Sequence, residues 1–456
     1  MTSTIDKTLK YKNHMISRRK LLVASSSAAI AGILNQYNPK KVLAASGQVV
    51  HFAPAGKRFD GVARALIPLF NKKYPNIKIK LESLPINETL TKTKVLMRSK
   101  SSAFDVITED HANFAMMHKL GALTPLDKML ESDTKWYNEY KEDVSDSYRA
   151  LYRWPRPNGT QYGMSNDGNV NLMFYRKDVF DKLGISVPKT WEDVLDVMKE
   201  IHDPKNERYA YAAAMKRNFW AGFEFYAALR SFGGHQFDRK EEGYWNPTFN
   251  SEAGYQALKV LKDMMQFAHP VTSNAGEDEI NAAFANGSAL FGPLSWGTAT
   301  LNNPDFTKLY EDWHFDLPPK GSNPEGGHRP LTGGLGQFIP TWSKNKDAAF
   351  EWMKFLNSGD AQDREITDTL VRVGGQPARL SALNRYKNTK YFFAGLLKCF
   401  PYAVSHVVAI PEAYNIFDQI GAEVHDAANG YISIDDALKE IDKKTRRILS
   451  DSGYYK

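Results

Sequence analysis

Short clusters of polar and aromatic side chains follow strand-like segments of this chain, in TEDHANF, MSNDGN, RNFWAGFEF and GPLSWGT. The members that are suited to holding a ligand are Glu109, Asp110, His111, Asn113, Asn166, Asp167, Trp220 and Trp296. Carboxylates and amides form directional hydrogen bonds with hydroxyl groups, and the flat faces of tryptophan rings pack against C–H groups. The combination therefore predicts a binding site for an uncharged, hydroxyl-rich molecule such as a carbohydrate.

Five of these positions also have a purely structural interpretation. Glu109 and Asp110 suit a helix N-terminus, where carboxylates complement the helix dipole, and His111 suits a solvated helix start. Trp220 and Trp296 stand in irregular or turn-like sequence, where a position in the core is the alternative to a binding surface. The residues alone leave both interpretations open at these five positions.

Motifs of the common enzyme classes are missing from the sequence. It has no Walker-type phosphate loop, no G-x-S-x-G nucleophile elbow, no H-E-x-x-H and no cysteine and histidine spacing for a metal. TGGLGQF at 332–338 is rich in glycine but lacks the spacing of a dinucleotide-binding loop. We therefore expect no cofactor, no metal and no catalytic residue. A carboxylate pair has no spacing signature, so an enzyme that uses Asp110 and Asp167 stays open.

The segments that would position these clusters alternate between helical and strand patterns. Apolar residues at 62, 66, 69 and 70 predict a helix that ends at Pro75, and NIKIKLESL predicts the strand after it. AFDVIT and NVNLMFYR predict two more strands, and KTWEDVLDVMKEI predicts a helix that begins with a capping box at Thr190 and Asp193 and buries Trp191. This order indicates an α/β fold, and the length of about 410 residues after the first 45 favours two lobes.

The first 45 residues differ in character from the rest. Arg18 and Arg19 stand in SRRKLL, ahead of an apolar run from Leu21 to Leu34 that is 14 residues long. A membrane span needs roughly 20 residues, so the run is too short for one. The order is typical of a cleavable export signal of the twin-arginine type, with cleavage near Ala44–Ala45. An uncleaved anchor or a disordered basic tail is the alternative.

The positive charge of the chain lies in this segment. The chain has 59 basic and 52 acidic residues, of which residues 1–45 hold 8 and 1, so that 51 of each remain. A neutral body gives no electrostatic reason to bind nucleic acid or an anionic membrane. The single cysteine, Cys399, is predicted to be a small buried apolar residue. Since no cysteine stands directly after the signal, where a lipid would be attached, we expect a free periplasmic protein rather than a lipoprotein.

Longer stretches of the chain resemble the extracellular solute-binding proteins of sugar-type ABC importers, the maltose-binding-protein-like family. FDVITEDHANFAMMHKLGALTPLDKML and YGMSNDGNVNLMFYRKDVFDKLGISVPKTWEDVL follow that family's motifs. The second stretch has Ser165 where proline is usual and Arg176 where asparagine is usual. FANGSALFGPLSW, GGLGQFIPTWSKNKDAAFEWMKFL and GGQPARLSAL come next, in the family's order. The resemblance covers nearly all of the chain after the signal.

The resemblance implies a two-lobe periplasmic binding protein fold of type II, in which a ligand cleft lies between lobes that are joined by crossing hinge segments. It places the signal at residues 1–45 and divides the rest of the chain into four parts. Residues 46–165 and 328–377 form lobe 1, and residues 166–327 and 378–456 form lobe 2.

The resemblance also implies which positions face the cleft. The loop after FDVIT and the segment after YG are among them, which adds support to the polar residues named above. TGGLG contributes Thr332, Gly333 and Gly334, and Tyr414 in PEAYNIF closes over the ligand. The turn at GPLSW departs from the family pattern, because Trp296 comes two residues later than the stacking aromatic. Arg379 is a further candidate, although its sequence favours a surface turn.

In function, the resemblance implies the periplasmic substrate-binding component of an ABC importer. Such a protein binds a monosaccharide, an oligosaccharide or a polyol by hinge closure, as a monomer, and delivers it to permease subunits without covalent chemistry. Two alternatives stay open: a secreted carbohydrate-active enzyme, and a receptor for a non-sugar solute. The cluster sequences carry no group of Arg or Lys residues for a phosphate, whereas their acidic residues would suit a polyamine.

Overall fold

The computed structural model describes residues 46–56, 59–238, 245–295, 298–366, 376–388, 391–405 and 407–455. The predicted signal at 1–45 and Trp296 lie outside these ranges. The chain from Ala45 to Lys456 forms one compact unit. Within the described ranges, no helix has both the length and the apolar character needed to cross a membrane.

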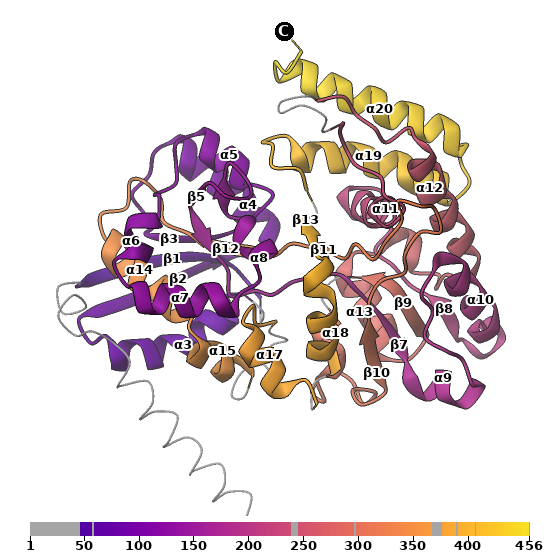
Figure 1. Ribbon diagram of the computed structural model, residues 1–456, viewed down its shortest axis with the longest axis horizontal. Coiled ribbons are helices and arrows are strands. Elements are labelled where there is room, and N and C mark those ends of the chain that lie inside the picture. The colour runs from indigo at the N-terminus through magenta and orange to yellow at the C-terminus, as the bar shows by residue number, and fades with distance from the viewer. Residues whose placement is uncertain are drawn as a thin grey trace, which may run out of the picture. The chain divides into compact units, whose positions relative to one another are not determined.

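A five-stranded sheet is built from the first part of the chain and one later strand. Its order is β2 (Ile77–Leu84), β1 (Gly47–Pro54), β3 (Val106–Asp110), β12 (Leu335–Phe338) and β6 (Gly163–Met164). The first three strands are parallel, and β12 runs antiparallel to β3 and β6. Helices α3 (Asp60–Lys73), α4 (Ile86–Arg98) and α14 (Lys346–Leu356) pack against this sheet (Figure 1).

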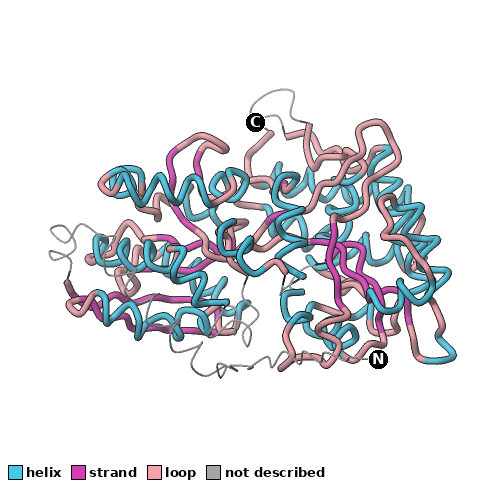
Figure 2. The backbone as a smooth tube through the Cα atoms, turned by 60° about the horizontal axis from the view of Figure 1, so that its bottom comes forward, coloured by secondary structure: helices cyan, strands magenta, loops and turns pink. Residues whose placement is uncertain are grey.

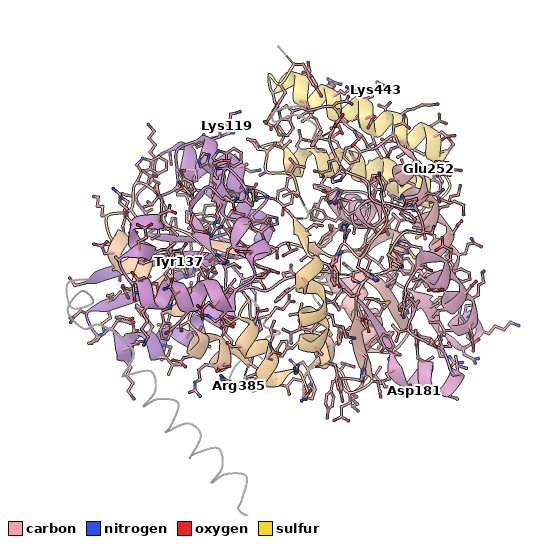
Figure 3. All side chains as sticks on the ribbon, viewed as in Figure 1. Lys119, Tyr137, Asp181, Glu252, Arg385 and Lys443 are labelled. Atoms are coloured by element: carbon pink, nitrogen blue, oxygen red, sulfur yellow. The ribbon has the colours of Figure 1, made fainter. Side chains whose placement is uncertain are left out.

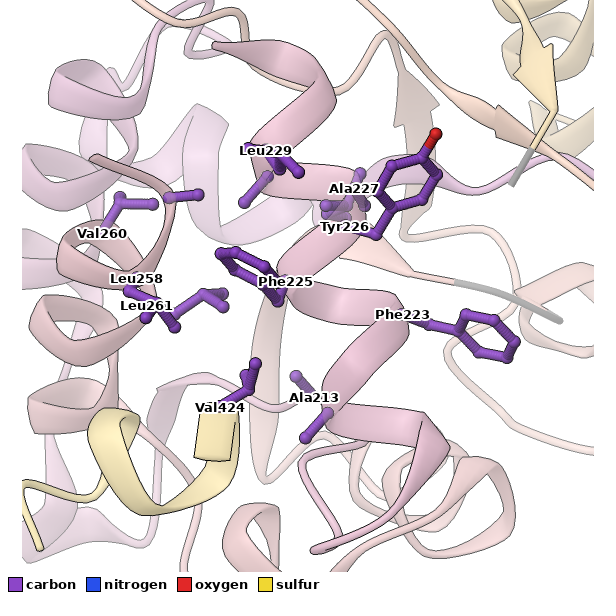
Figure 4. Packing of buried hydrophobic residues seen from close by; sticks show 14 of the residues in the cluster. Ala213, Phe223, Phe225, Tyr226, Ala227, Leu229, Leu258, Val260, Leu261 and Val424 are labelled. Carbon is purple, nitrogen blue, oxygen red and sulfur yellow. The ribbon is translucent and has the colours of Figure 1, made fainter. Parts of the chain in front are cut away.

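A four-stranded sheet forms from the middle of the chain. Its order is β10 (Trp313–Asp316), β7 (Leu172–Arg176), β9 (Ala289–Ser295) and β8 (Tyr209–Tyr211). The helices around it include α10 (Trp191–Ile201), α11 (Phe219–Ser231), α12 (Glu252–Met264), α19 (Ala413–Ala428) and α20 (Ile434–Asp451). Their apolar faces meet in a core in which Phe225 and Leu229 of α11 face Leu258, Leu261 and Val424 (Figure 4).

Shorter elements fill the connections (Figure 2). The helices are α5 (Phe114–Lys119), α6 (Asp127–Glu131), α7 (Thr134–Asp143), α8 (Asp146–Ala150), α9 (Lys177–Leu183), α13 (Glu277–Ala285), α15 (Gly359–Arg364), α17 (Leu380–Tyr386) and α18 (Tyr391–Cys399). The 3-10 helices are η1 (Pro204–Asn206), η2 (Met265–Phe267), η3 (Thr272–Asn274), η4 (Thr298–Asn302) and η6 (Phe400–Tyr402). Two small ribbons pair β4 (Arg153–Trp154) with β5 (Thr160–Gln161), and β11 (Leu331–Thr332) with β13 (Val404–Ser405).

Three segments connect the two sheets and lie side by side. The first, 165–171, joins β6 to β7, and the second, 317–334, joins β10 to β12. They meet at a bridge between Val170 and Thr332. The third segment is described at its end, residues 376–379, and this part pairs with the first segment. Asp167 forms a bridge with Pro377, and the Ala378 N–H donates to the Asn166 carbonyl at 3.2 Å. The first segment is therefore held between the other two.

Several local predictions are confirmed. Thr190 and Asp193 form the capping box at the start of α10, and Trp191 is buried, with its indole N–H donating to Ser231. Cys399 is a free, fully buried cysteine. The predicted helix that ends before Pro75 is α3, and the strand predicted in NIKIKLESL is β2.

Candidate ligand-binding site

The carboxyl end of β3 carries the first predicted cluster. We expected Glu109 and Asp110 just past this strand, but the strand continues through both of them. The reason is the antiparallel partner β12, whose residues Leu335 and Gly336 pair with Asp110 and Glu109. This pairing joins residues more than 200 positions apart, so the local sequence of β3 gives no sign of it.

Asp110 is the member of this cluster that reaches across to the other sheet's helices. Its Oδ1 accepts the Ala112 N–H at 2.8 Å, and its carboxyl group accepts a hydrogen bond from the Tyr414 hydroxyl at the start of α19. Burial raises the pKa of the Asp110 carboxyl to about 7, helped by the nearby Glu109 and Asp167 carboxylates and opposed by the two hydrogen bonds. Near neutral pH, this carboxyl group therefore exists in both protonation states.

Glu109 and Asn113 lie behind Asp110 and bind each other. The Asn113 amide donates to Glu109 Oε1 at 3.1 Å, and the same oxygen accepts the Asp110 N–H at 2.9 Å. Both side chains are buried, and burial raises the pKa of Glu109. Asn113 occupies the N-cap position of α5 without a capping side-chain bond. Glu109 and Asn113 thus fix the conformation of the strand end.

His111 is fully buried, so the alternative of a solvated helix start is wrong. Its Nδ1 lies 3.4 Å from Asp110 Oδ1, and its Nε2 lies 3.4 Å from the Ser405 hydroxyl. The Arg156 guanidinium donates to the same hydroxyl at 3.2 Å. Ser405 and Arg156 were not among the predicted site residues, because no local spacing connects residues 249 positions apart.

Asp110, His111 and Ser405 lie next to one another as the members of a catalytic triad do, but the proton of the Ser405 hydroxyl does not point towards His111. Ser405 donates its one hydroxyl proton to the Val407 carbonyl at 2.8 Å. A serine nucleophile needs the histidine as acceptor for that proton. His111 instead lies on the side where the Ser405 oxygen accepts hydrogen bonds. The contact between the two residues is therefore structural.

The second predicted cluster lies in the first crossing segment. Both polar atoms of the Asn166 amide are bound by protein groups: its Nδ2 donates to Glu365 Oε1 at 2.9 Å, and its Oδ1 accepts from Gln337 Nε2 at 2.6 Å. Asp167 Oδ2 accepts the Leu335 N–H at 3.3 Å. These side chains join the crossing segments to each other and to β12.

Thr332, Gly333 and Gly334 belong to the second crossing segment. The Thr332 hydroxyl and the Gly333 N–H both donate to the Asn169 carbonyl, at 3.3 and 3.1 Å. Gly334 has φ +101°, and a Cβ on it would lie 2.9 Å from Asp167 Oδ2. Only glycine fits this position without strain.

Trp220 and Tyr414 stand on neighbouring helices. The sequence predicts an irregular or turn-like context for Trp220, but the residue lies in the first turn of α11, whose N-cap Asn218 accepts the Trp220 N–H at 3.1 Å. This cap residue is a signal in the sequence that predicts the helix start. The Trp220 ring packs on Phe219 at 5.0 Å, and the Tyr414 ring lies 6.2 Å from that of Phe219. Both Trp220 and Tyr414 are half-buried.

Arg379 is buried, which contradicts the surface turn that its sequence favours. Its Nε donates to the Asn357 carbonyl at 2.8 Å, and its Nη1 lies 3.2 Å from Asp143 Oδ2. The guanidinium also stacks against Trp136 and Tyr140. These contacts hold the third crossing segment against helix α7.

The predicted residues therefore fall into groups with different surroundings. Asp110, His111 and Tyr414 meet, together with Ser405 and Arg156, where β3 approaches α19. A second group, in the crossing segments, consists of Asn166, Asp167, Thr332, Gly333 and Gly334. Trp220 lies on α11, next to α19, which carries Tyr414. Trp296 is outside the described residues. In the described ranges, no cluster of three or more His, Cys, Asp or Glu residues is arranged to hold a metal ion.

A separate pocket of about 390 Å³ lies on the four-stranded sheet's side of the chain. Its walls come from residues 232–238, 248–253 and 323–325. None of the predicted site residues lines it. The predicted site residues and this pocket therefore lie in different parts of the chain.

The sequence matches a known family and known relatives. Residues 53–363 match the family described as bacterial extracellular solute-binding protein. The mannitol-binding protein of Pseudomonas aeruginosa is 23% identical over 411 residues, which cover 86% of this chain and 91% of that protein.

Two solved structures show the same fold. An ABC transporter solute-binding protein from Agrobacterium radiobacter K84 in complex with ribitol has a TM-score of 0.77 at 20% identity, covering 88% of this chain and 99% of its own. The maltose-bound MalE3 of T. maritima has a TM-score of 0.75 at 21% identity, covering 88% of this chain and 100% of its own. The expected two-lobe α/β fold is confirmed by these likenesses. Because the family match spans most of the sequence, the chain belongs to the bacterial extracellular solute-binding proteins.

Proposed function

We propose that this protein is the substrate-binding component of an ABC importer and that it binds a small polyol or a sugar. The observation that carries the proposal is the meeting of the Asp110 carboxyl group with the Tyr414 hydroxyl, between the end of a parallel strand and a helix of the other sheet. Ligands of open α/β sheets collect at the carboxyl ends of strands. The mannitol, ribitol and maltose named for the related proteins are all uncharged and rich in hydroxyls.

The proposed mechanism is hinge closure around the ligand. Asp110 accepts hydrogen bonds from the hydroxyl groups of the ligand. The rings of Trp220 and Tyr414 cover the C–H groups of the ligand. A ligand that touches both lobes binds the closed form more tightly and therefore shifts the population towards it. Asn166, Asp167, Thr332, Gly333 and Gly334 act in the hinge, where their contacts join the crossing segments. Trp296 remains a candidate for a second stacking surface.

The proposal extends to the organisation and location of the protein. Lobe 1 comprises residues 46–165 and 328–377, and lobe 2 comprises residues 166–327 and 378–456. A twin-arginine signal at 1–45 delivers the protein to the periplasm without a lipid anchor. There it works as a monomer, and its closed form presents the ligand to the permease subunits.

The proposal assigns no covalent chemistry to the site. Asp110 and Asp167 are the carboxylate pair that a glycosidase would use. Asp167 is held by the Leu335 N–H and packs against Gly334, so it is committed to the hinge. The ligand accordingly leaves the protein unchanged.

Thermal unfolding with candidate ligands tests the proposal. Mannitol, ribitol or maltose at 100 times its dissociation constant should stabilise the fold by about 2.7 kcal/mol. Asp110→Ala should abolish this shift, whereas the control Asp181→Asn, on an exposed face of α9, should retain it. Chromatography of the recovered ligand should show no product. The absence of a shift with every carbohydrate, or turnover of any of them, would contradict the proposal.

A polyamine receptor is the second candidate. Glu109, Asp110 and Asp167 lie close enough for their charges to raise the pKa of Asp110, and such a group of acids suits a ligand with several amines. Spermidine therefore belongs in the same thermal experiment. Stabilisation by spermidine without stabilisation by polyols would favour this second function.

A further inference from the structure

Two adjacent residues at the end of β3 contact both ends of the segment 404–414. Asp110 accepts a hydrogen bond from Tyr414, and His111 Nε2 lies 3.4 Å from the Ser405 hydroxyl. This segment leads from β13 into α19, which packs against α11 beside the four-stranded sheet. The contacts therefore join the two lobes directly, in addition to the crossing segments.

Neighbouring groups hold both ends of the segment in place. The Tyr414 ring lies 6.2 Å from the rings of Phe219 and Phe223 on α11, which fixes the direction of its hydroxyl. The Ser405 hydroxyl donates to the Val407 carbonyl within the segment, which fixes its direction. It also accepts from Arg156, which belongs to the five-stranded sheet's side of the chain and therefore adds a further contact between the lobes. Each end of the segment thus presents a preformed polar group to β3, so little entropy is lost when the contacts form.

We propose that Asp110 and His111 on one lobe, and Ser405 and Tyr414 on the other, form a latch that favours the closed form of the ligand-free protein, and that a proton on Asp110 favours closure further. A protonated Asp110 still accepts the Tyr414 hydroxyl through its carbonyl oxygen, and it no longer carries a buried charge. The latch acts before any ligand arrives and sets the fraction of empty protein that is closed.

The surroundings of Asp110 give the direction of the pH dependence. Burial raises the pKa of Asp110 to about 7 where its carboxyl group meets Tyr414, and the proposal places this contact in the closed form. The titratable groups that face Asp110 are Glu109 on β3, His111 after β3, Asp167 in the first crossing segment, Tyr152 after α8, and Tyr414 on α19.

In an open cleft, water solvates the Asp110 carboxylate, and the pKa of this group then returns to about 4. The closed form therefore binds a proton that the open form lacks between about pH 4 and 7. Closure is favoured at the acidic end of this window and declines by up to tenfold per pH unit towards pH 7.

The test measures closure without ligand. Lys119→Cys and Lys443→Cys place two dyes on exposed positions of α5 and α20 (Figure 3), while the native Cys399 is buried and does not react. Single-molecule energy transfer between the dyes is recorded from pH 5 to pH 8.5. The unmutated latch should give a closed population that falls as the pH rises.

Three latch variants and one control sharpen the result. Tyr414→Phe and Ser405→Ala should lower the closed population severalfold at acidic pH. Asp110→Asn keeps the acceptor without a charge and should keep the protein closed at every pH. The control Tyr455→Phe removes a tyrosine hydroxyl that donates to the Trp245 carbonyl at 2.5 Å, outside the segment 404–414, and should match the unmutated protein. A closed population that is independent of pH, or equal in Tyr414→Phe and Tyr455→Phe, would overturn the latch.

The inference rests on the proposed closure of two lobes, but the two can fail separately. Stabilisation by a carbohydrate together with unchanged energy transfer in the latch variants would overturn the latch alone. The expected energy-transfer changes in a protein that no carbohydrate stabilises would overturn the proposed ligand alone.

Discussion

At the residue scale, the site depends on side chains that serve the backbone as much as the ligand. Asn166, Asp167 and Arg379 were predicted as ligand contacts, yet each makes hydrogen bonds to protein groups, of β12 in the case of Asp167 and of helix ends in the case of Asn166 and Arg379. Asp110 differs, because its hydrogen bond to Tyr414 spans the two lobes. A polar residue in such a chain can therefore shape the site without touching the ligand.

Gly334 gives the first prediction at this scale. Gly334→Ala forces an L-residue to φ +101° and places its Cβ 2.9 Å from Asp167 Oδ2, so we expect a loss of about 1–3 kcal/mol in the free energy of unfolding. Urea denaturation measures this loss. The matched control is Gly430→Ala, where φ is +79° but nothing lies within 4 Å of the added Cβ. Equal losses in both variants would show that the contact with Asp167 has no effect.

At the element scale, the local sequence predicts what short-range interactions decide. The capping box at Thr190 and the buried face of α10 depend on residues within one helix, and both are confirmed. The end of β3 was predicted wrongly because β12, which extends it, lies far along the chain. The contact of Arg156 with Ser405 was missed for the same reason. Trp220 could have been placed correctly, since Asn218 is a typical N-cap.

The junction of the crossing segments leads to a prediction about pH. Glu365 accepts the Asn166 amide at 2.9 Å, and burial raises its pKa well above the usual value, with Asp167 adding to the effect. The folded protein therefore holds a proton on Glu365 that the unfolded chain releases above its ordinary pKa near 4.5. Stability from this group is full at acidic pH and declines as the pH rises from there.

Glu365→Gln removes this dependence, because glutamine keeps an acceptor for Asn166 and cannot ionise. We expect the variant to gain stability relative to the unmutated protein as the pH rises from 5 to 8, measured by urea denaturation at each pH. The control Glu139→Gln replaces a carboxylate that is 48% exposed and should not change the slope. Parallel pH profiles for Glu365→Gln and the unmutated protein would contradict the prediction.

At the scale of the whole molecule, the five-stranded sheet is completed only late in the chain. Residues 335–338 of β12 pair with both β3 and β6, and without them these two strands lack their common neighbour. Folding of this lobe therefore requires most of the sequence to be present. An export route that carries folded proteins fits such a chain, because it allows these long-range pairings to form before translocation.

The last prediction concerns that route. The segment that contains Arg18 and Arg19 lies outside the described residues, and its assignment to the twin-arginine pathway is our proposal. The pathway reads the arginine pair itself and not its charge, so Arg18→Lys with Arg19→Lys should retain the precursor in the cytoplasm, as cell fractionation and immunoblotting would show. The control Lys10→Arg changes a basic residue outside the pair and should leave export unchanged. Equal periplasmic yields from all three chains would mean that the body crosses the membrane by a route for unfolded proteins, and that β12 joins β3 and β6 only in the periplasm.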